Sequence, residues 1–270
     1  MNIADLAPLV ITAFEDGHSE NTVISVKDGN SRDVVTALDE RLHEVAEYFL
    51  AQNSPETLLV SEEGVAGEPF PKGASGDVLI VDPLDGSSNF ALELRDFGFM
   101  ACHLVDFRIL SGLVVIPKEN IYLIWNDGVL SCSRPMPIKE GDTSSPVYLA
   151  YPPDLSEIGA KTRDNLLEAS DNESSGVYRY GSACLGLYRT LRGAHAAFVA
   201  IDVRIWDVIA FLPMLVASGV RVHYLFEHQR VSIVAARNQR LSQALLASFS
   251  PSLARPFIEF RPGDKLSWEA

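Results

Sequence analysis

The sequence contains few cysteines and has a deficit of basic residues. The three cysteines, Cys102, Cys132 and Cys184, are widely spaced and include no C-x-x-C pair. This pattern argues against a disulfide framework or a zinc site and fits a reduced protein. Only 22 Lys and Arg stand against 36 Asp and Glu, which gives a formal net charge of −14. Because such an acidic surface repels polyanions, we expect neither a nucleic acid polymer nor a membrane as a partner.

We expect neither a membrane span nor a signal peptide. No stretch approaches the roughly eighteen uninterrupted apolar residues of a span. The N-terminal segment MNIADLAPLVITAFEDGHSE has no basic leader before its short apolar stretch, so we expect a cytoplasmic location. With 47% hydrophobic and 21% charged residues over 270 positions, the composition is that of a globular protein. A small anionic substrate stays compatible with the acidic charge, because bound metal ions invert the local field.

The pattern of apolar residues predicts a mixed α/β chain. Helical periodicity is clear over residues 33–52. Two short apolar runs, 57–60 and 77–81, predict strands that end in acidic residues. Residues 97–116 and 121–132 alternate apolar and polar positions, which predicts an antiparallel meander.

The Pro-containing stretch of residues 133–146 is the best candidate for a boundary between subdomains. We expect an N-terminal α+β subdomain over residues 1–140 and a C-terminal α/β subdomain over residues 141–270, together forming one compact catalytic unit. Strands and helices alternate beyond the boundary and include a helix from about Trp206 to Ser218, which Pro213 should kink or end. Layers of sheets and helices are the expected architecture for such a chain.

The most informative stretch is VDPLDGSSNF, residues 81–90. Gly86 permits a tight turn, which would return Asp85 to the side of Asp82. The carbonyl group of Leu84 would then lie between the two carboxylates. Two carboxylates and a carbonyl form a site for a hard cation, which favours Mg²⁺ or a similar ion.

The same stretch could also be a simple surface turn, because Asp, Pro and Gly each favour turns for backbone reasons. Two other acidic residues favour a site instead: Glu62 follows a predicted strand, and Asp207 lies at a predicted helix start. Asp207 could equally be a helix-dipole residue. Ser87 and Ser88 are good N-cap residues, so the helix after Gly86 can begin with N–H groups that form an anion site.

Three motifs, SEEG, DPLDGSSNF and WDVIA, resemble in order and spacing the signatures of the inositol monophosphatase family of Mg²⁺-dependent phosphomonoesterases. Residues 33–39, DVVTALD, resemble the D-x-V-T-x-x-D segment of the family, and residues 180–183 resemble its G-[ST]-A segment. The resemblance covers about residues 30–220. It implies a layered α-β-α-β-α sandwich of the inositol monophosphatase and fructose-1,6-bisphosphatase type, and a homodimer.

The resemblance also implies roles for individual residues. The implied metal ligands hold two or three Mg²⁺ ions, for which Mn²⁺ could substitute, and are Glu62, Asp82, the Leu84 carbonyl, Asp85 and Asp207. The implied catalytic residues are Asp39 and Ser87, which would orient and deprotonate the attacking water, and Glu62. The implied substrate-binding residues are Gly86, Ser87, Gly181, Ser182 and Ala183.

The implied function is that of a Mg²⁺-dependent phosphatase, which hydrolyses the phosphate monoester of a small metabolite with a metal-activated water. Candidate substrates are a sugar or inositol phosphate, a bisphosphonucleoside and histidinol phosphate. Ala200 stands where inositol-binding members carry Glu, which argues against inositol phosphate. The alternative is a catalytically silent relative that acts as a binding or regulatory protein. A phosphatase with an aspartyl intermediate is a third hypothesis, but it requires D-x-D and the spacing here is D-x-x-D.

Overall fold

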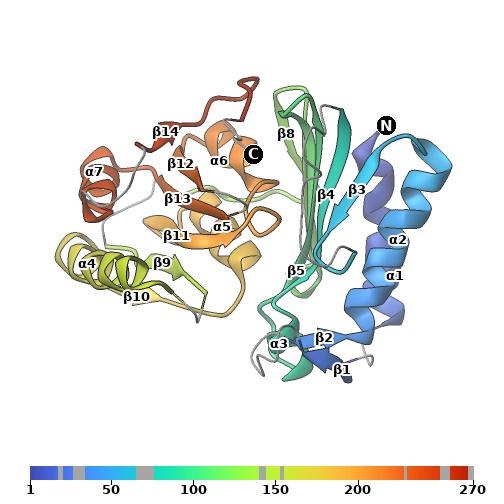
Figure 1. Ribbon diagram of the computed structural model, residues 1–270, viewed down its shortest axis with the longest axis horizontal. Coiled ribbons are helices and arrows are strands. Elements are labelled where there is room, and N and C mark those ends of the chain that lie inside the picture. The colour runs from blue at the N-terminus through green and yellow to red at the C-terminus, as the bar shows by residue number, and fades with distance from the viewer. Residues whose placement is uncertain are drawn as a thin grey trace. The chain divides into compact units, whose positions relative to one another are not determined.

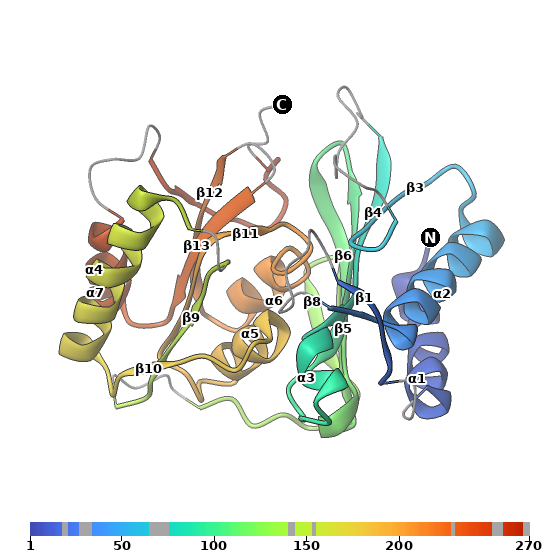
Figure 2. The ribbon, with the colours of Figure 1, turned by 60° about the horizontal axis from the view of Figure 1, so that its bottom comes forward.

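The computed structural model describes residues 1–17, 21–26, 34–64, 76–139, 144–152, 155–227, 230–249 and 256–266 (Figures 1 and 2). The contacts between residues divide the chain into two compact units. Unit 1 consists of residues 1–135, 181–185 and 206–210, and unit 2 of residues 136–180, 186–205 and 211–270. Asp33, the first residue of the predicted D-x-V-T-x-x-D segment, lies outside the described residues. Within the described residues, every helix is too short or too polar to cross a membrane.

Unit 1 contains a six-stranded sheet with the strand order β3-β4-β5-β6-β7-β8. Its strands are β3 (Leu58–Ser61), β4 (Asp77–Asp85), β5 (Gly98–Val105), β6 (Arg108–Ile116), β7 (Ile121–Asn126) and β8 (Val129–Cys132). β3 runs parallel to β4, and all other neighbours are antiparallel. The antiparallel meander predicted from the alternating pattern is therefore confirmed.

The other elements of unit 1 are η1 (Ile3–Asp5), α1 (Leu6–Asp16), β1 (Val23–Val26), β2 (Val34–Thr36), α2 (Ala37–Asn53), α3 (Ser87–Ala91) and η3 (Pro117–Glu119).

Two of these helices, α1 and α2, pack against the sheet of unit 1. Leu6 of α1 and Leu42 of α2 belong to one buried cluster with Leu79 and Val81 of β4. α2 begins a few residues later than predicted, because Val34–Thr36 pair with β1 and Thr36 is the N-cap of the helix.

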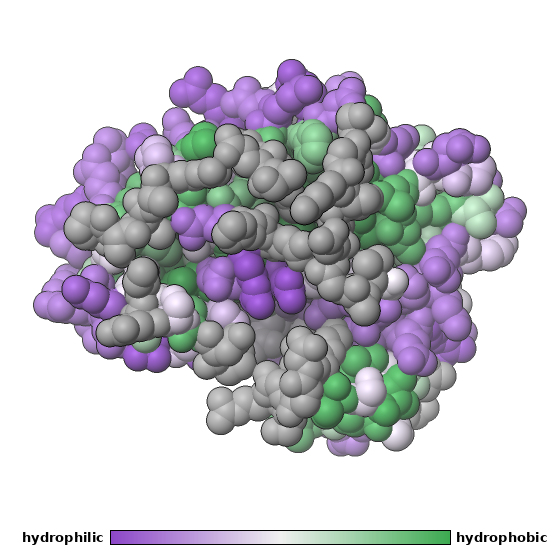
Figure 3. Space-filling model, in the orientation of Figure 1, coloured by the Kyte–Doolittle hydropathy of each residue, from purple (hydrophilic) through white to green (hydrophobic). Residues whose placement is uncertain are grey.

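Apolar side chains remain exposed at β1 and just after α3. Their exposed fractions are 43% for Val23, 46% for Ile24, 47% for Val26, 70% for Leu92 and 49% for Leu94. Figure 3 shows apolar surface over this part of unit 1. Exposed apolar patches are typical of surfaces that meet another molecule. The homodimer implied by the resemblance stays a prediction.

Unit 2 contains a second six-stranded sheet, with the strand order β10-β9-β11-β13-β12-β14. Its strands are β9 (Val147–Ala150), β10 (Val177–Tyr178), β11 (Ala197–Arg204), β12 (Arg221–Glu227), β13 (Arg230–Ala236) and β14 (Ile258–Glu259). β9 runs parallel to both β10 and β11, and the remaining neighbours are antiparallel. The helices are α4 (Glu157–Glu173), α5 (Ala183–Leu191), α6 (Phe211–Ala217) and α7 (Gln239–Ser248). The first three residues of α5 belong to unit 1.

Helices cover both faces of the second sheet. Val147 of β9 packs in one buried cluster with Leu166 of α4 and Leu241 of α7. The next residue of β9, Tyr148, points to the opposite face because side chains alternate along a strand. Gly186 of α5 lies against the Tyr148 ring, since a Cβ at Gly186 would be 2.6 Å from that ring. Unit 2 is therefore a helix–sheet–helix sandwich.

The prediction of a helix starting at Trp206 is wrong, because α6 begins at Phe211. Pro213 is its third residue, and proline is tolerated only in the first turn of a helix, where its missing N–H is not needed. Residues 206–210 form turns instead and belong to unit 1. Asp207 therefore lies in a turn segment that precedes the helix.

Candidate active site

Both acidic residues of the DPLD motif lie on β4, where a bulge turns them to the same face. Asp82 pairs with Met100 of β5, and Asp85 pairs with Gly98. Residues three apart in a regular strand point to opposite faces. Here the bulge makes the three-residue step from Asp82 to Asp85 on β4 pair with the two-residue step from Met100 to Gly98 on β5. Residues two apart in a strand point to the same face, so Met100 and Gly98 share a face, and Asp82 and Asp85 share it with them. The two acids come together through this bulge and not through the predicted tight turn.

The tight turn follows the strand, at Gly86. Its backbone is left-handed, with a φ of 89°. A Cβ at this position would lie 2.7 Å from the carbonyl oxygen of Asp96, so only glycine fits. Gly86 is also the N-cap of α3, a position for which the sequence favoured Ser87 or Ser88. Ser87 is the first residue of α3, and its hydroxyl makes a different contact.

Ser87 links the end of β4 to helix α2. Its Oγ lies 2.6 Å from Oδ1 of Asp39 and 2.8 Å from the carbonyl oxygen of Leu84. Oδ2 of Asp39 accepts hydrogen bonds from the N–H of Thr36, at 2.8 Å, and from its hydroxyl, at 2.6 Å. A hydroxyl has a single proton, so when Ser87 donates it to Asp39 its lone pairs can accept another proton. The predicted pair of Asp39 and Ser87 is thus in direct contact.

The carboxylate of Asp85 lies at the N-terminal end of α5. Oδ1 accepts a hydrogen bond from the N–H of Ala183 at 2.9 Å. Oδ2 accepts one from the N–H of Cys184, at 3.0 Å, and one from the hydroxyl of Ser182. This approach requires a glycine at position 98, because a Cβ on Gly98 would lie 2.7 Å from Sγ of Cys184. A carboxylate has about four lone-pair positions, so about one remains for a cation.

The pKa of Asp85 is raised from 3.8 to about 6, chiefly by burial. Its three hydrogen bonds act in the opposite direction, and the negative charge of Glu62 raises the pKa further. Burial also raises the pKa of the Cys184 thiol, as do the charges of Asp85 and Asp82. These acidic side chains therefore lie close enough to repel one another when ionised. A bound cation would reduce this repulsion between the carboxylates. Shifted pKa values of this kind are common at functional sites.

The other predicted metal ligands lie in the same unit. Glu62 directly follows β3, and its N–H donates to the carbonyl oxygen of Val81 at 3.2 Å. Asp82 is 1% exposed, and Asp207 is half-buried. Among the described residues, no three His, Cys, Asp or Glu side chains are positioned as a ready-made metal cluster. The available donors are nevertheless all oxygen atoms, and the carboxylates of Glu62, Asp82 and Asp85 lie in one acidic region, so their chemistry fits a hard divalent cation.

The predicted substrate-binding segment passes α3 before it reaches Asp85. Gly181 has a φ of 74°, and a Cβ there would lie 3.4 Å from Oδ1 of Asn89 in α3. Asn89 in turn donates to the carbonyl oxygen of Asp96 at 2.6 Å. Gly181, Ser182 and Ala183 therefore connect α3 to the carboxylate of Asp85.

Ala200, the residue that argues against inositol phosphate, is fully buried in β11 of unit 2. The strand has a bulge just after it, between Ala200 and Val203, where Asp202 has a φ of 54°. The N–H of Asp202 donates to Oγ of Ser232 at 3.1 Å, and its carbonyl oxygen accepts from Arg230 at 3.0 Å. The methyl group of Ala200 offers no acceptor for a substrate hydroxyl.

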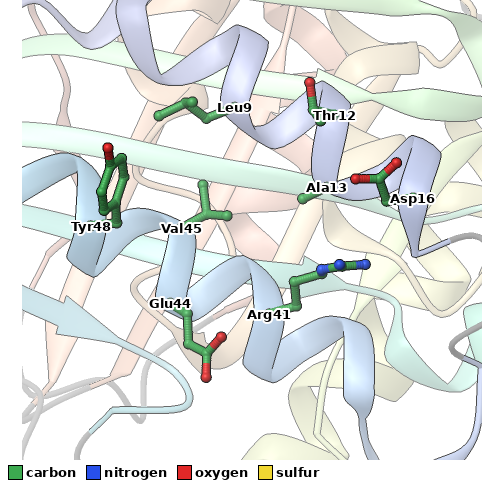
Figure 4. A pocket seen from close by; sticks show the side chains of 8 residues that line it. All are labelled: Leu9, Thr12, Ala13, Asp16, Arg41, Glu44, Val45 and Tyr48. Carbon is green, nitrogen blue, oxygen red and sulfur yellow. The ribbon is translucent and has the colours of Figure 1, made fainter.

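A surface groove of about 360 Å³ lies between α1 and α2 (Figure 4). Its lining residues are Leu9, Thr12, Ala13, Asp16, Arg41, Glu44, Val45 and Tyr48. None of the predicted site residues lines this groove, so it does not belong to the candidate active site.

The sequence analysis assigns no role to three residues of the site: Thr36, Gly98 and Cys184. Thr36 does have a local signal, because Thr36 and Asp39 match the T-x-x-[DE] pattern of a capping box. Gly98 and Cys184 have none. They meet Asp85 only because the sheet and α5 bring distant parts of the chain together.

Comparisons with known proteins agree with the motifs. Residues 3–253 match the model of the "Inositol monophosphatase family". The "Nus factor SuhB" of Pseudomonas aeruginosa is 25% identical over 247 residues, which cover 86% of this chain and 88% of the relative.

Two solved structures have a similar fold. An "IMPase" of Thermotoga maritima has a TM-score of 0.73 and 18% identity, and the match covers 92% of this chain and 98% of that one. An "IMPase/NADP phosphatase complexed with Mg²⁺ and phosphate" has a TM-score of 0.75 and 15% identity, and the match covers 96% and 97% of the two chains. The predicted fold class, a layered α/β architecture of the inositol monophosphatase type, is confirmed.

Proposed function

Because the chain belongs to the inositol monophosphatase family, we propose that it is a Mg²⁺-dependent phosphatase that hydrolyses the phosphate monoester of a small metabolite. The observation that carries this proposal is the 2.6 Å hydrogen bond between Ser87 and Asp39 beside the acidic end of β4. The pair offers a route for the proton of an attacking water next to a site for cations.

In the proposed reaction, the oxygen of a water molecule forms a bond to phosphorus as the ester P–O bond breaks. The water gives its proton to Oγ of Ser87, which passes its own proton to Oδ1 of Asp39. Asp39 is held for this role by its two hydrogen bonds from Thr36. The departing alkoxide takes a proton from solvent water and Asp39 later releases its proton to solvent, so the products are inorganic phosphate and the alcohol. General base catalysis of this kind contributes about 10²–10⁴-fold to the rate.

The proposed metal ligands are Glu62, Asp82, the Leu84 carbonyl, Asp85 and Asp207. When bound, Mg²⁺ ions supply positive charge that lowers the pKa of water and stabilises the departing oxygen. The chain's own contribution is to hold the carboxylates at fixed positions, Asp85 through its hydrogen bonds to the start of α5. The N–H groups of Gly86 and Ser87 would orient the phosphate. The number of ions and the acceptance of Mn²⁺ stay predictions.

The proposed substrate is a small phosphorylated metabolite other than inositol phosphate. The residue type at position 200 supports this restriction, because Ala stands where inositol-binding members carry Glu and has no acceptor for an inositol hydroxyl. Sugar phosphates, a bisphosphonucleoside and histidinol phosphate are the remaining candidates. One structural neighbour is an "IMPase/NADP phosphatase", which supports the inclusion of a phosphorylated nucleotide in any substrate panel.

A second candidate function is that of a regulatory or binding protein without turnover. The relative from Pseudomonas aeruginosa, named a "Nus factor", favours this alternative. The presence of both Asp39 and Ser87, in contact with one another, favours the enzyme.

Phosphate release from a panel of phosphorylated metabolites, measured with Mg²⁺ and with EDTA, tests the proposal. We expect Mg²⁺-dependent turnover of at least one compound. Ser87→Ala should lower kcat by about 10²–10⁴-fold because the proton route is lost. The matched control is Ser88→Ala, which removes a hydroxyl from the next position and should retain turnover. Mg²⁺ binding without turnover of any compound would contradict the phosphatase and support the binding protein.

A further inference from the structure

Helix α2 makes a second contact with the acidic site, one turn after Asp39. Nδ1 of His43 lies 2.9 Å from Oγ of Ser61, the last residue of β3. On the other side of the ring, Nε2 lies 3.4 Å from the carboxylate of Glu47. The His43 side chain is 16% exposed and Ser61 is buried, whereas the Glu47 side chain is 60% exposed. The stronger contact of the imidazole is thus directed inward, to the residue that precedes Glu62.

The imidazole also packs against the turn that carries Glu62. A Cβ at Gly64 would lie 2.8 Å from Cε1 of His43, so the ring occupies the space that a side chain at position 64 would need. The turn is closed by a hydrogen bond of 3.1 Å from the N–H of Gly64 to the carbonyl oxygen of Ser61. The histidine ring therefore contacts both the start and the end of the segment from Ser61 to Gly64.

One helix thus reaches two parts of the site. Asp39 and His43 are four residues apart and lie on the same side of α2. Asp39 contacts Ser87 at the end of β4, and His43 contacts Ser61 at the end of β3. Because α2 is rigid, these two contacts fix the spacing between the proton route and the turn that carries Glu62.

We propose that His43 is a positioning residue: by its contacts with Ser61 and Gly64 it holds the turn from Ser61 to Gly64 and so directs the carboxylate of Glu62 toward Asp85. This inference rests on the proposed function, in which Glu62 is a metal ligand. His43 touches neither substrate nor ion in this role. It acts only through the turn.

The test compares His43→Leu, which removes the hydrogen bond, with His43→Asn, whose amide can reach Ser61 as Nδ1 does. Mg²⁺ binding to metal-free protein is measured by titration calorimetry, and hydrogen exchange is measured in peptides that span residues 58–64. We expect His43→Leu to weaken Mg²⁺ binding about tenfold or more, since partners that orient metal ligands contribute about 10–100-fold to affinity. Exchange in the turn should become faster, and His43→Asn should restore most of both properties.

Two further variants separate the inner contact from the outer one. Glu47→Ala removes the exposed partner of His43, and it should leave Mg²⁺ affinity nearly unchanged because exposed ion pairs contribute little. Ser61→Ala removes the inner partner and should weaken binding as His43→Leu does. The double variant of His43 and Ser61 should then be no weaker than either single variant, because both changes break the same contact.

A folded His43→Leu protein with parental Mg²⁺ affinity and parental exchange in the turn would overturn the inference, as would additive effects in the double variant. Failure of the proposed function has a different signature. It is seen in the parent, as Mg²⁺ binding without turnover, and the effect of His43→Leu on binding and exchange would still stand. A parent that binds no Mg²⁺ would overturn both.

Discussion

Asp85 in unit 1 and His195 in unit 2 are both buried titratable side chains, and burial has opposite effects on their pKa values. It raises the pKa of Asp85 from 3.8 to about 6 and lowers the pKa of His195 from 6.5 to about 4. Both shifts favour the neutral form. The neutral form of His195 can satisfy both of its ring nitrogens. Its Nε2 lies 2.8 Å from the hydroxyl of Tyr180, and its Nδ1 lies 3.3 Å from the carbonyl oxygen of Gly186.

Asp85 has different surroundings. Ser182, Ala183 and Cys184 all donate hydrogen bonds to it, which favour the charged form, while burial and Glu62 oppose that form. The surroundings of His195 therefore accommodate its neutral form without an ion, whereas a nearby positive charge would favour the ionised form of Asp85. This difference is what one expects between a packing cluster and a functional site.

The largest effect expected from this comparison is on turnover. Asp85→Asn removes a charge from the proposed metal ligands, so kcat should fall roughly 1000-fold, which corresponds to about 4 kcal/mol. The matched change in the other cluster, His195→Gln, should leave kcat close to the parent value. Phosphate release at saturating Mg²⁺ measures both. Near-parental turnover of Asp85→Asn would remove Asp85 from the mechanism.

The next effect concerns the stability of the metal-free protein as the pH changes. The folded pKa of Asp85, about 6, is above the unfolded value of 3.8, so stability is greatest below the unfolded pKa and is lost as the pH rises through the folded pKa. The loss is on the order of 3 kcal/mol. Asp85→Asn should therefore gain stability relative to the parent over this range, as measured by urea unfolding in EDTA. A constant difference between the two proteins would show that the folded pKa of Asp85 is not raised.

Much of the acidic cluster can be predicted from the sequence, because its chemistry is local. The apolar run before Asp82 predicts a buried strand, and Gly86 predicts a turn. The side of the strand on which Asp85 lies cannot be predicted in this way. It depends on the pairing of Asp85 with Gly98, because the register between β4 and β5 shifts between Asp82 and Asp85.

The contacts of His195 are even harder to predict from the sequence. His195 follows α5, and the aromatic partners of its ring, Tyr148 and Tyr180, come from separate parts of unit 2. No local pattern predicts that they meet. The contact between His43 and Ser61 is equally remote, since it joins a helix to the end of the following strand. Motifs therefore predict which groups are available, and the packing of distant elements decides which of them interact.

His195→Leu tests the second cluster. Near neutral pH it should lower the free energy of unfolding by about 1–3 kcal/mol, because Tyr180 and Gly186 lose their hydrogen bonds to the ring. The folded pKa of His195 is below the unfolded value, so its contribution to stability is present above pH 6.5 and is lost as the pH falls through about 4. The difference between parent and variant should therefore shrink as the pH is lowered. A difference that grows would show that the ring is charged in the folded protein.

Ser182→Ala has the smallest expected effect on stability and isolates one donor of the acidic cluster. The loss of its bonds to Asp85 and to the N–H of Leu185 should cost about 1 kcal/mol. Because this donor lowers the pKa of Asp85, its removal should raise that pKa, and protons should then compete with Mg²⁺ more strongly near pH 6 than near pH 8. Thr190→Val, which removes another buried hydroxyl of α5, should cost stability without this pH dependence. If Ser182→Ala bound Mg²⁺ with equal affinity at both pH values, the N–H groups of Ala183 and Cys184 would be enough to stabilise the charged form of Asp85.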